Sequence, residues 1–190
     1  LYAAMANAAG AKYHGVNSTI AGNLRGQGAI GQEAIAIGPN ATADAQRSIA
    51  IGYGALNNNA SYPNSDAYDS IAIGSNATTT NINSVAIGRK AIAGREYTIA
   101  IGDEANASGV WATALGLQTN ATGNFSMAMG IRSNATGLSS SSYGLQANAH
   151  GDYSLALGAA SNASATNATA IGTFANASGL SSITFGENAS

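Results

Sequence analysis

The 190-residue chain lacks cysteine altogether and contains only 2 prolines. Without cysteine it has neither disulfide bonds nor thiolate metal ligands, which is compatible with an exported protein. Charged residues make up 8% of the chain and its formal net charge is −2. It therefore has no basic surface to neutralise the phosphates of a nucleic acid. No apolar run approaches the roughly 20 residues of a membrane-spanning helix, so we expect no direct insertion of this segment into a membrane.

Glycine, in contrast, is abundant and regularly placed. A phrase of apolar, small, apolar and glycine residues recurs along the chain, and at its clearest it is Ile-Ala-Ile-Gly. The motif glycines are Gly38, Gly52, Gly74, Gly88, Gly102, Gly116, Gly130, Gly144, Gly158, Gly172 and Gly186. Their numbers rise by 14 in nine of the ten steps, and by 22, or 14 + 8, in the step from Gly52 to Gly74. This period predicts a solenoid in which each repeat forms one coil stacked on the last.

Each coil is predicted to contain two short strands. The residues three and one before the motif glycine are mostly large and β-branched, and they alternate with small residues, which is the pattern of a strand. A second segment, three to five residues after the glycine, is rich in alanine. We therefore expect an all-β fold, a parallel β-roll of 14-residue coils in which equivalent strands pair from coil to coil.

The alternation also suggests which face of the first strand is buried. We expect its large residues to form the core of the roll; among these are Ile49, Ile51, Ile71, Ile73, Val85, Ile87, Ile99 and Ile101. The opposite face is small throughout, whereas a solvated face would carry long polar side chains in some coils. We therefore expect a second chain to pack on it, in an obligate homo-oligomer. The predicted interface includes Ser48, Ala50, Ser70, Ala72, Ser84, Ala86, Ala100, Ala114 and Ala128.

These repeats closely resemble the head repeats of trimeric autotransporter adhesins of the YadA-like type. That family's repeat has the form S-V-A-I-G-x-x-[SA]-x-A, and here it appears as Ser84-Val85-Ala86-Ile87-Gly88 followed by Ala91 and Ala93. The similarity covers about residues 34–190. It implies a left-handed β-roll, assembled as a homotrimer and displayed on a bacterial cell surface. In such proteins a C-terminal region, absent from this chain, anchors the head to the outer membrane.

The resemblance also implies a function. It is attachment to a host extracellular-matrix protein (collagen, fibronectin or laminin) or to a host cell-surface receptor, by multivalent binding. Two alternatives share the fold: a structural spacer in a trimeric surface fibre, and a self-association module, each with the ligand site elsewhere. We divide the chain into an N-terminal cap with degenerate coils, residues 1–33, and the repeat roll, residues 34–190, with an inserted loop within 57–69.

The inserted loop is the largest departure from the repeat. It is rich in turn-forming residues, and we predict that Tyr62, Asp66 and Tyr68 contact the ligand. The alternative is a tolerated surface insertion. The acidic residues of the loop match the spacing of no calcium loop, so we expect no metal site there.

Residues at equivalent positions of successive coils form columns, and three of these stand out. An aromatic column, interrupted at Ser139, comprises Tyr97, Trp111, Phe125 and Tyr153, and an aliphatic column comprises Leu117, Ile131 and Leu145. The aromatic column is interpreted as an inward or corner ladder or a contact with a neighbouring chain, and alternatively as an exposed binding stripe. The aliphatic column is interpreted as an interchain contact rather than an exposed patch. Asparagines in Asn-x-Ser/Thr sequences, many four to six residues after the motif glycine, are interpreted as turn chemistry.

No catalytic set emerges from the sequence. The two histidines, His14 and His150, lie many coils apart, and the few carboxylates are scattered. A trimeric left-handed β-helix acyltransferase would have hexapeptide repeats, and an ice-binding solenoid would have regular threonine arrays. Neither pattern is present. We therefore expect no enzymatic activity and no cofactor.

Overall fold

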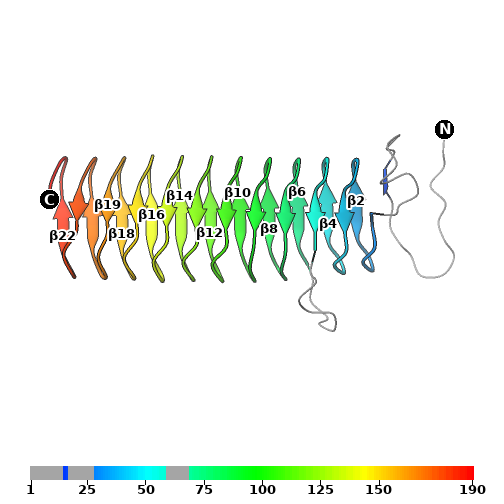
Figure 1. The fold of residues 1–190 in the computed structure, drawn as a ribbon, viewed down its shortest axis with the longest axis horizontal. Coiled ribbons are helices and arrows are strands. Elements are labelled where there is room, and N and C mark those ends of the chain that lie inside the picture. Colours follow the sequence, from blue (N-terminus) through cyan, green and yellow to red (C-terminus); the bar gives the residue numbers. More distant parts are fainter. Residues whose placement is uncertain (1–14, 17–27, 59–68) are drawn as a thin grey trace. The chain divides into compact units, whose positions relative to one another are not determined.

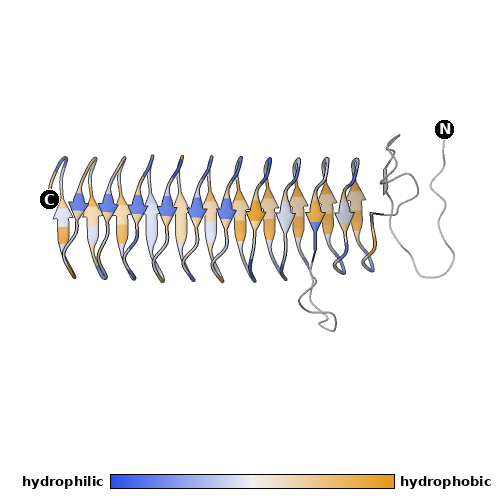
Figure 2. Ribbon diagram, in the orientation of Figure 1, coloured by the Kyte–Doolittle hydropathy of each residue, from blue (hydrophilic) through white to orange (hydrophobic). Residues whose placement is uncertain are grey.

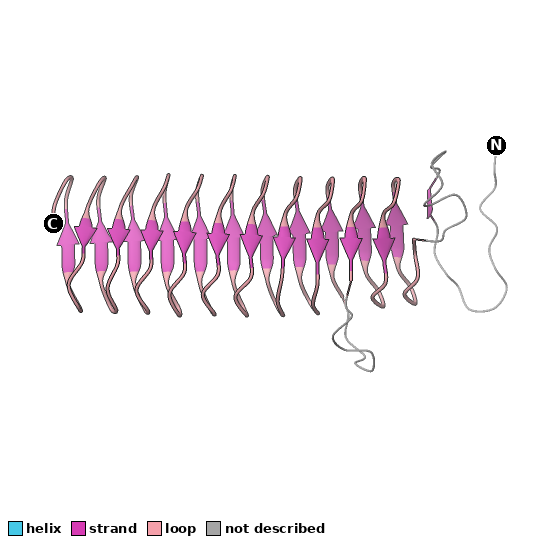
Figure 3. Cartoon of the chain, in the orientation of Figure 1, coloured by secondary structure: helices cyan, strands magenta, loops and turns pink. Residues whose placement is uncertain are grey.

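The computed structural model of the chain describes residues 15–16, 28–58 and 69–190, and every regular element among them is a β-strand (Figure 3). The chain divides into two compact units, Leu1–Tyr97 and Thr98–Ser190. Each unit is a parallel β-solenoid of 14-residue coils, so the predicted all-β repeat architecture is confirmed. Each coil contributes one strand to a sheet formed by the motif residues, the motif sheet, and one to the opposite return sheet (Figure 1).

The described residues of the first unit form nine strands. Its motif sheet has the order β1-β2-β4-β6-β8, and its return sheet has the order β3-β5-β7-β9. The motif strands are β1 (Gly15–Val16), β2 (Ile35–Ile37), β4 (Ile49–Ile51), β6 (Ile71–Ile73) and β8 (Val85–Ile87). The return strands are β3 (Thr42–Ala43), β5 (Leu56–Asn57), β7 (Thr78–Thr79) and β9 (Ile92–Ala93).

The second unit repeats the same plan without interruption. Its motif strands are β10 (Ile99–Ile101), β12 (Thr113–Leu115), β14 (Met127–Met129), β16 (Ser141–Tyr143), β18 (Leu155–Leu157), β20 (Thr169–Ile171) and β22 (Ile183–Phe185). Its return strands are β11 (Asn106–Ala107), β13 (Asn120–Ala121), β15 (Asn134–Ala135), β17 (Asn148–Ala149), β19 (Asn162–Ala163) and β21 (Asn176–Ala177). Within each sheet of this unit, successive strands pair in parallel.

The register of the strands follows the sequence period. In the second unit Ala100 pairs with Ala114, its equivalent in the next coil. In the first unit Ala50 pairs with Ala72, its equivalent on the far side of the insertion. The eight extra residues between β5 and β6 therefore leave the coil-to-coil register unchanged.

The motif glycine is dictated by the backbone at the first turn of each coil. Gly116 has a φ of +135°, which side-chain-bearing residues rarely adopt. A Cβ atom added there would lie 2.5 Å from the carbonyl oxygen of Gly130 in the next coil. The turn is held by coil-to-coil hydrogen bonds, such as that from the Gly116 N–H to the Ile101 carbonyl at 2.8 Å. The close stacking of the turns thus explains why glycine recurs at this position.

Two further positions in each coil have left-handed backbone although most of their residues are not glycine. One is the second residue after the motif glycine, for example Gln118 with φ 53°. The other is the fifth residue before it, for example Phe125 with φ 58°. Their N–H groups donate to the preceding coil, Gln118 to the Asp103 carbonyl and Phe125 to the Val110 carbonyl, each at 2.8 Å. These bonds hold a conformation that costs an ordinary residue about 1 kcal/mol.

The interior of the roll consists of small side chains, and here the predicted faces are inverted. All of the small residues predicted to contact a second chain are 0–1% exposed within one chain: Ser48, Ala50, Ser70, Ala72, Ser84, Ala86, Ala100, Ala114 and Ala128. They face the return-sheet alanines, such as Ala41 and Ala43, which are likewise fully buried. The two sheets lie so close that only alanine, serine, threonine and glycine fill the space between them in most coils. The backbone that packs on the small face therefore belongs to the chain itself.

The predicted core residues lie on the outer face of the motif sheet instead. Ile49, Ile51, Ile71, Ile73, Val85 and Ile87 are half-buried, and Ile99 and Ile101 are exposed. Their assignment to the core was wrong, because the thin interior has no room for branched side chains. The solvent-facing surface of this sheet is consequently apolar.

Candidate functional site

The outer face of the motif sheet presents an apolar surface in both units. In the first unit it carries isoleucines and one valine, residues 35 to 87. In the second unit it is more varied and includes Met127, Met129, Tyr143 and Leu157. The Tyr143 hydroxyl donates to the Met127 sulfur at 3.0 Å across this face. Continuous apolar surface of this kind on a sheet marks an interaction surface.

The aliphatic column forms one edge of this face in the second unit. Leu117, Ile131 and Leu145 each follow a motif glycine directly, and all three side chains are exposed in the single chain; we name them the aliphatic edge. They stack from coil to coil because the same turn recurs once in every coil. Their contact with another chain stays a prediction.

The aromatic column lies at the opposite turn of each coil. Trp111, Phe125 and Tyr153 are 54%, 58% and 58% exposed, and Tyr97, in the first unit, is also exposed. They occupy the left-handed corner position, so the corner placement is confirmed and the inward orientation is excluded. We name Trp111, Phe125 and Tyr153, all in the second unit, the aromatic edge.

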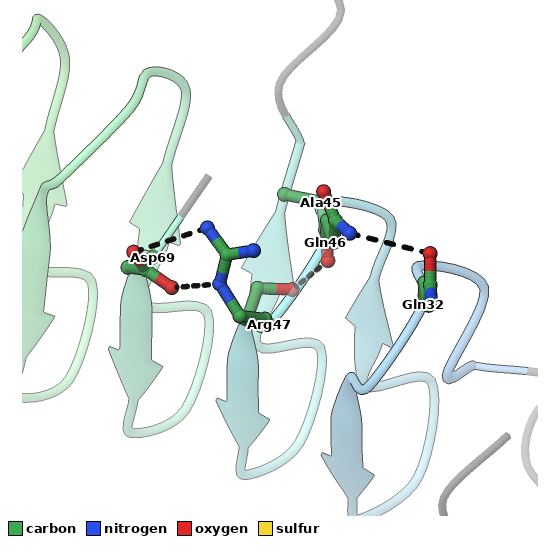
Figure 4. Close-up of polar contacts among 6 residues, drawn as sticks. Gln32, Ala45, Gln46, Arg47 and Asp69 are labelled. Carbon is green, nitrogen blue, oxygen red and sulfur yellow. Dashed lines mark hydrogen bonds and ion pairs between the residues drawn. The ribbon is translucent and has the colours of Figure 1, made fainter. Parts of the chain in front are cut away.

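The stem of the inserted loop is held from outside by an ion pair. The Arg47 guanidinium contacts both carboxylate oxygens of Asp69, with Nε to Oδ1 at 2.7 Å and Nη2 to Oδ2 at 3.4 Å (Figure 4). Beside this pair, the Gln46 amide donates to the side-chain oxygen of Gln32, one coil earlier, at 3.2 Å. The bidentate pair fixes the corner at which the insertion rejoins the roll.

The same stem is also held from inside. Asn57, which replaces the usual interior alanine, is fully buried, and its Oδ1 accepts a hydrogen bond from the Ser70 hydroxyl at 2.9 Å. The Asn58 N–H donates to the Thr79 carbonyl at 2.9 Å, and the Ile49 N–H donates to the Ser70 carbonyl at 2.9 Å. Both ends of the insertion therefore belong to the rigid roll.

The predicted ligand contacts Tyr62, Asp66 and Tyr68 lie outside the described residues, as does His14. Their role stays a prediction. The described structure adds that the loop carrying them starts and ends at fixed points of adjoining coils.

An asparagine ladder runs along the outer face of the second unit's return sheet. Asn120 donates to Asn134 at 3.0 Å, Asn134 to Asn148 at 2.9 Å, and Asn162 to Asn176 at 2.8 Å. These asparagines are strand residues, and Asn120, Asn134 and Asn148 also donate to the carbonyl of the turn residue two positions earlier, so the interpretation as turn chemistry covers only part of their role. The signal was present in the sequence, because asparagine stands four residues after the motif glycine in six consecutive coils, from Asn106 to Asn176.

A polar chain connects two opposite charges beside the aliphatic edge. Gln118 donates to the Glu104 carboxylate at 2.9 Å, and its own oxygen accepts from Arg132 Nε at 3.0 Å. The glutamine thus bridges a carboxylate and a guanidinium that lie two coils apart. Together with the asparagine ladder, these contacts give the second unit side-chain bonds along its length.

The described residues offer little for chemistry. They contain no group of three His, Asp or Glu residues that could hold a metal ion. His150 lies on the surface and shares a hydrogen bond of 2.9 Å with the Thr136 hydroxyl. This contact with a threonine is not a pairing with a catalytic acid or base. Burial raises the pKa of the Asp44 carboxyl, which stands alone at a surface position after β3.

Comparison with known proteins identifies the repeat. The two-copy family pattern of the YadA head domain repeat matches residues 29–55, 65–91, 96–119, 107–133, 121–147, 135–161, 149–175 and 163–189. Comparison with curated protein sequences gave no match. In the part of the chain that the structure describes, no helix has the length and apolar character needed to span a membrane. The matches cover nearly every described coil, so the chain belongs to the family of YadA head domain repeats, and its coils form an adhesin-type head domain.

Proposed function

We propose that this chain is the head of a bacterial surface adhesin, a homotrimer of left-handed β-rolls that attaches to a host extracellular-matrix protein or cell-surface receptor. One observation carries the proposal: head-domain repeats extend from residue 29 to residue 189, and their motif sheets present an apolar face to solvent. The number of chains and the handedness are those that the resemblance to YadA-like heads implies. Anchoring to the outer membrane belongs to the same proposal.

The apolar motif face supports the homotrimer. The motif strand of each coil has two outward-facing positions. In the first unit both positions are occupied by branched residues that are still partly exposed in one chain. Burying the remaining surface of one such side chain contributes about 1 kcal/mol. Summed over many coils, this gain favours association through the motif face, the surface opposite to the one predicted from the small residues.

The insertion supports ligand binding. It departs from the repeat while its stem is fixed by the Arg47–Asp69 and Asn57–Ser70 contacts. A homotrimer displays three copies of Tyr62, Asp66 and Tyr68, so weak individual contacts combine into avid attachment. Collagen, fibronectin, laminin and a cell-surface receptor are the candidate ligands.

The test compares the chain with a loop-deletion variant. Removing residues 60–67 restores the regular repeat spacing while keeping both stem contacts, since 22 − 8 = 14. We expect the wild-type chain to be trimeric by light scattering and to bind one of the immobilised matrix proteins or intact host cells. The deletion variant is expected to stay trimeric and lose binding.

A matched control keeps the loop length and removes its side chains, with Tyr62, Asp66 and Tyr68 all changed to alanine. It should bind as weakly as the deletion variant. Full binding by the trimeric deletion variant would move the ligand site onto the roll. Full binding by the alanine variant alone would move it to other residues of the loop. A trimeric wild-type head that binds no matrix protein and no cell would favour the spacer or the self-association module.

A further inference from the structure

Both edges of the second unit's motif face are apolar over overlapping stretches of coils. We propose that the aromatic edge of one chain packs against the aliphatic edge of a neighbouring copy of the chain. The aromatic edge runs from Trp111 to Tyr153, with one interruption at Ser139, and the aliphatic edge from Leu117 to Leu145. The inference rests on the proposed homotrimer and specifies how neighbouring chains meet.

The two edges are both apolar in the coils of Gly116 and Gly130. The next coil combines Ser139 with Leu145, and the one after it combines Tyr153 with Ala159. In the coils that follow, the aromatic position is occupied by Asn167 and Ser181, and the aliphatic position by Thr173 and Glu187. Two solvent-facing edges would have no reason to be polar in the same last two coils. Edges that face each other across an interface of parallel chains in register would end together in this way.

The backbone conformation at the aromatic edge also supports contact with a neighbouring chain. Trp111, Phe125 and Tyr153 have φ values of 60°, 58° and 57°, a left-handed conformation that is unfavourable for bulky residues. Within one chain their rings are more than half exposed, so the chain alone gains little from placing aromatics there. Burial against a neighbour gives these residues a role, and hydrogen bonds from the Phe125 and Tyr153 N–H groups to the preceding coil hold these two in position beforehand.

Symmetry selects the partner edge. In a closed ring of parallel copies, each chain presents one edge to the next chain and the opposite edge to the previous one, so unlike edges meet. In a two-fold dimer, like edges meet. Because one edge is aromatic and the other aliphatic, and the two overlap in the coils of Gly116 and Gly130, the ring arrangement pairs the rings of Trp111 and Phe125 with branched side chains of the neighbouring copy.

The absence of cysteine allows a direct test by disulfide formation. The double variants are Phe125→Cys with Ile131→Cys and Phe125→Cys with Leu117→Cys, which test the aliphatic position of the same coil and that of the preceding coil. Phe125 and Ile131 flank strand β14 at opposite turns, beyond the Cα separation of about 7 Å that a disulfide permits within one chain. Mild oxidation of at least one double variant should give covalent trimers on non-reducing gels, and each single variant should give none.

A control pair, Thr122→Cys with Ser178→Cys, places exposed thiols on the return-sheet side and should not cross-link. The single tryptophan supplies a second readout in the unmodified protein. Acrylamide should quench Trp111 fluorescence several-fold less efficiently in the native trimer than in the urea-unfolded chain.

Four results would overturn the inference. A trimer without cross-links in both double variants and with freely quenched Trp111 would refute the edge contact while leaving the trimer intact. Covalent dimers from a single variant would show that like edges meet, and cross-linking of the control pair to the same extent would show that the thiols react without contact. A monomeric wild-type chain would refute the proposed trimer itself.

Discussion

The interiors of the two units are built from the same kinds of residue, and the outer surfaces of the two units differ. In the first unit the outward residue of each return strand is Thr42, Leu56, Thr78 or Ile92, and in the second unit it is asparagine in every return strand. Figure 2 shows the difference as hydrophilic strands along the return sheet of the second unit and more apolar ones in the first. The interior positions stay small in both units. The fold therefore fixes the turns and the interior and leaves the outer columns free to diverge.

The largest expected effect concerns the turn glycines, which the two units have in common. Gly38→Ala in the first unit and Gly116→Ala in the second should each lower the free energy of unfolding by about 3 kcal/mol, because both glycines have φ above +120° and abut the next coil. The added Cβ would lie 2.7 Å from the Gly52 oxygen in one case and 2.5 Å from the Gly130 oxygen in the other. Urea denaturation at fixed chain concentration, followed by circular dichroism, measures the loss.

Gly179→Ala is the matched control for both glycine variants. Its φ is not in the left-handed region, and a Cβ there would lie 3.5 Å from Ser182 Cβ, an ordinary contact. It should change stability by less than about 1 kcal/mol. If Gly116→Ala unfolds at the same urea concentration as Gly179→Ala, the backbone explanation of the motif glycine is wrong.

A smaller effect should separate the two units. Asn134→Ala removes the bond donated to Asn148 and the bond accepted from Asn120, so we expect a loss of about 1.5 kcal/mol. Thr78→Ala, at the equivalent place in the first unit, removes only a 3.4 Å contact to the Asn76 carbonyl and should cost about 0.5 kcal/mol. Equal losses in thermal or urea unfolding would show that the ladder adds no stability beyond the strand itself.

The sequence predicts the repeat better than it predicts the orientation of the strands. The spacing of the glycines gives the coil length, the strands and the turns, because each depends on local backbone geometry. The alternation in Ile49-Ala50-Ile51 defines two faces but does not say which is inside. That choice depends on the distance between the sheets, which the alanines of the opposite strand, such as Ala41 and Ala43, set at a small value. The inner face of the strand is therefore decided by the distance between two facing strands, which is not a local property of the sequence.

At the candidate site, too, the sequence predicts some features and leaves others undetermined. The eight-residue insertion is visible in the spacing, yet its stem contacts depend on Asn57 and Ser70 meeting inside the roll, from opposite ends of that insertion. The corner position of the aromatic column follows from the period. Its exposure depends on the left-handed corner, which a preference for glycine or asparagine would have signalled but which aromatic residues conceal.

The smallest expected effect concerns the left-handed position two residues after the motif glycine, where the units again differ. Three of the first unit's residues there, Asn40, Gly54 and Asn76, are types that tolerate this conformation, and the fourth is Lys90. The second unit has residues such as Gln118 and Ala160 there in every coil but the last, which has Asn188. Ala160→Gly should therefore raise the free energy of unfolding by about 0.5 to 1 kcal/mol, since it relieves the left-handed strain of alanine. Asn40→Gly should change it by only a few tenths, because asparagine carries less of that strain. A destabilised Ala160→Gly variant in urea unfolding would mean that the loss of backbone entropy outweighs the strain, and that the second unit's residues at this turn are as well accommodated as the first unit's asparagines.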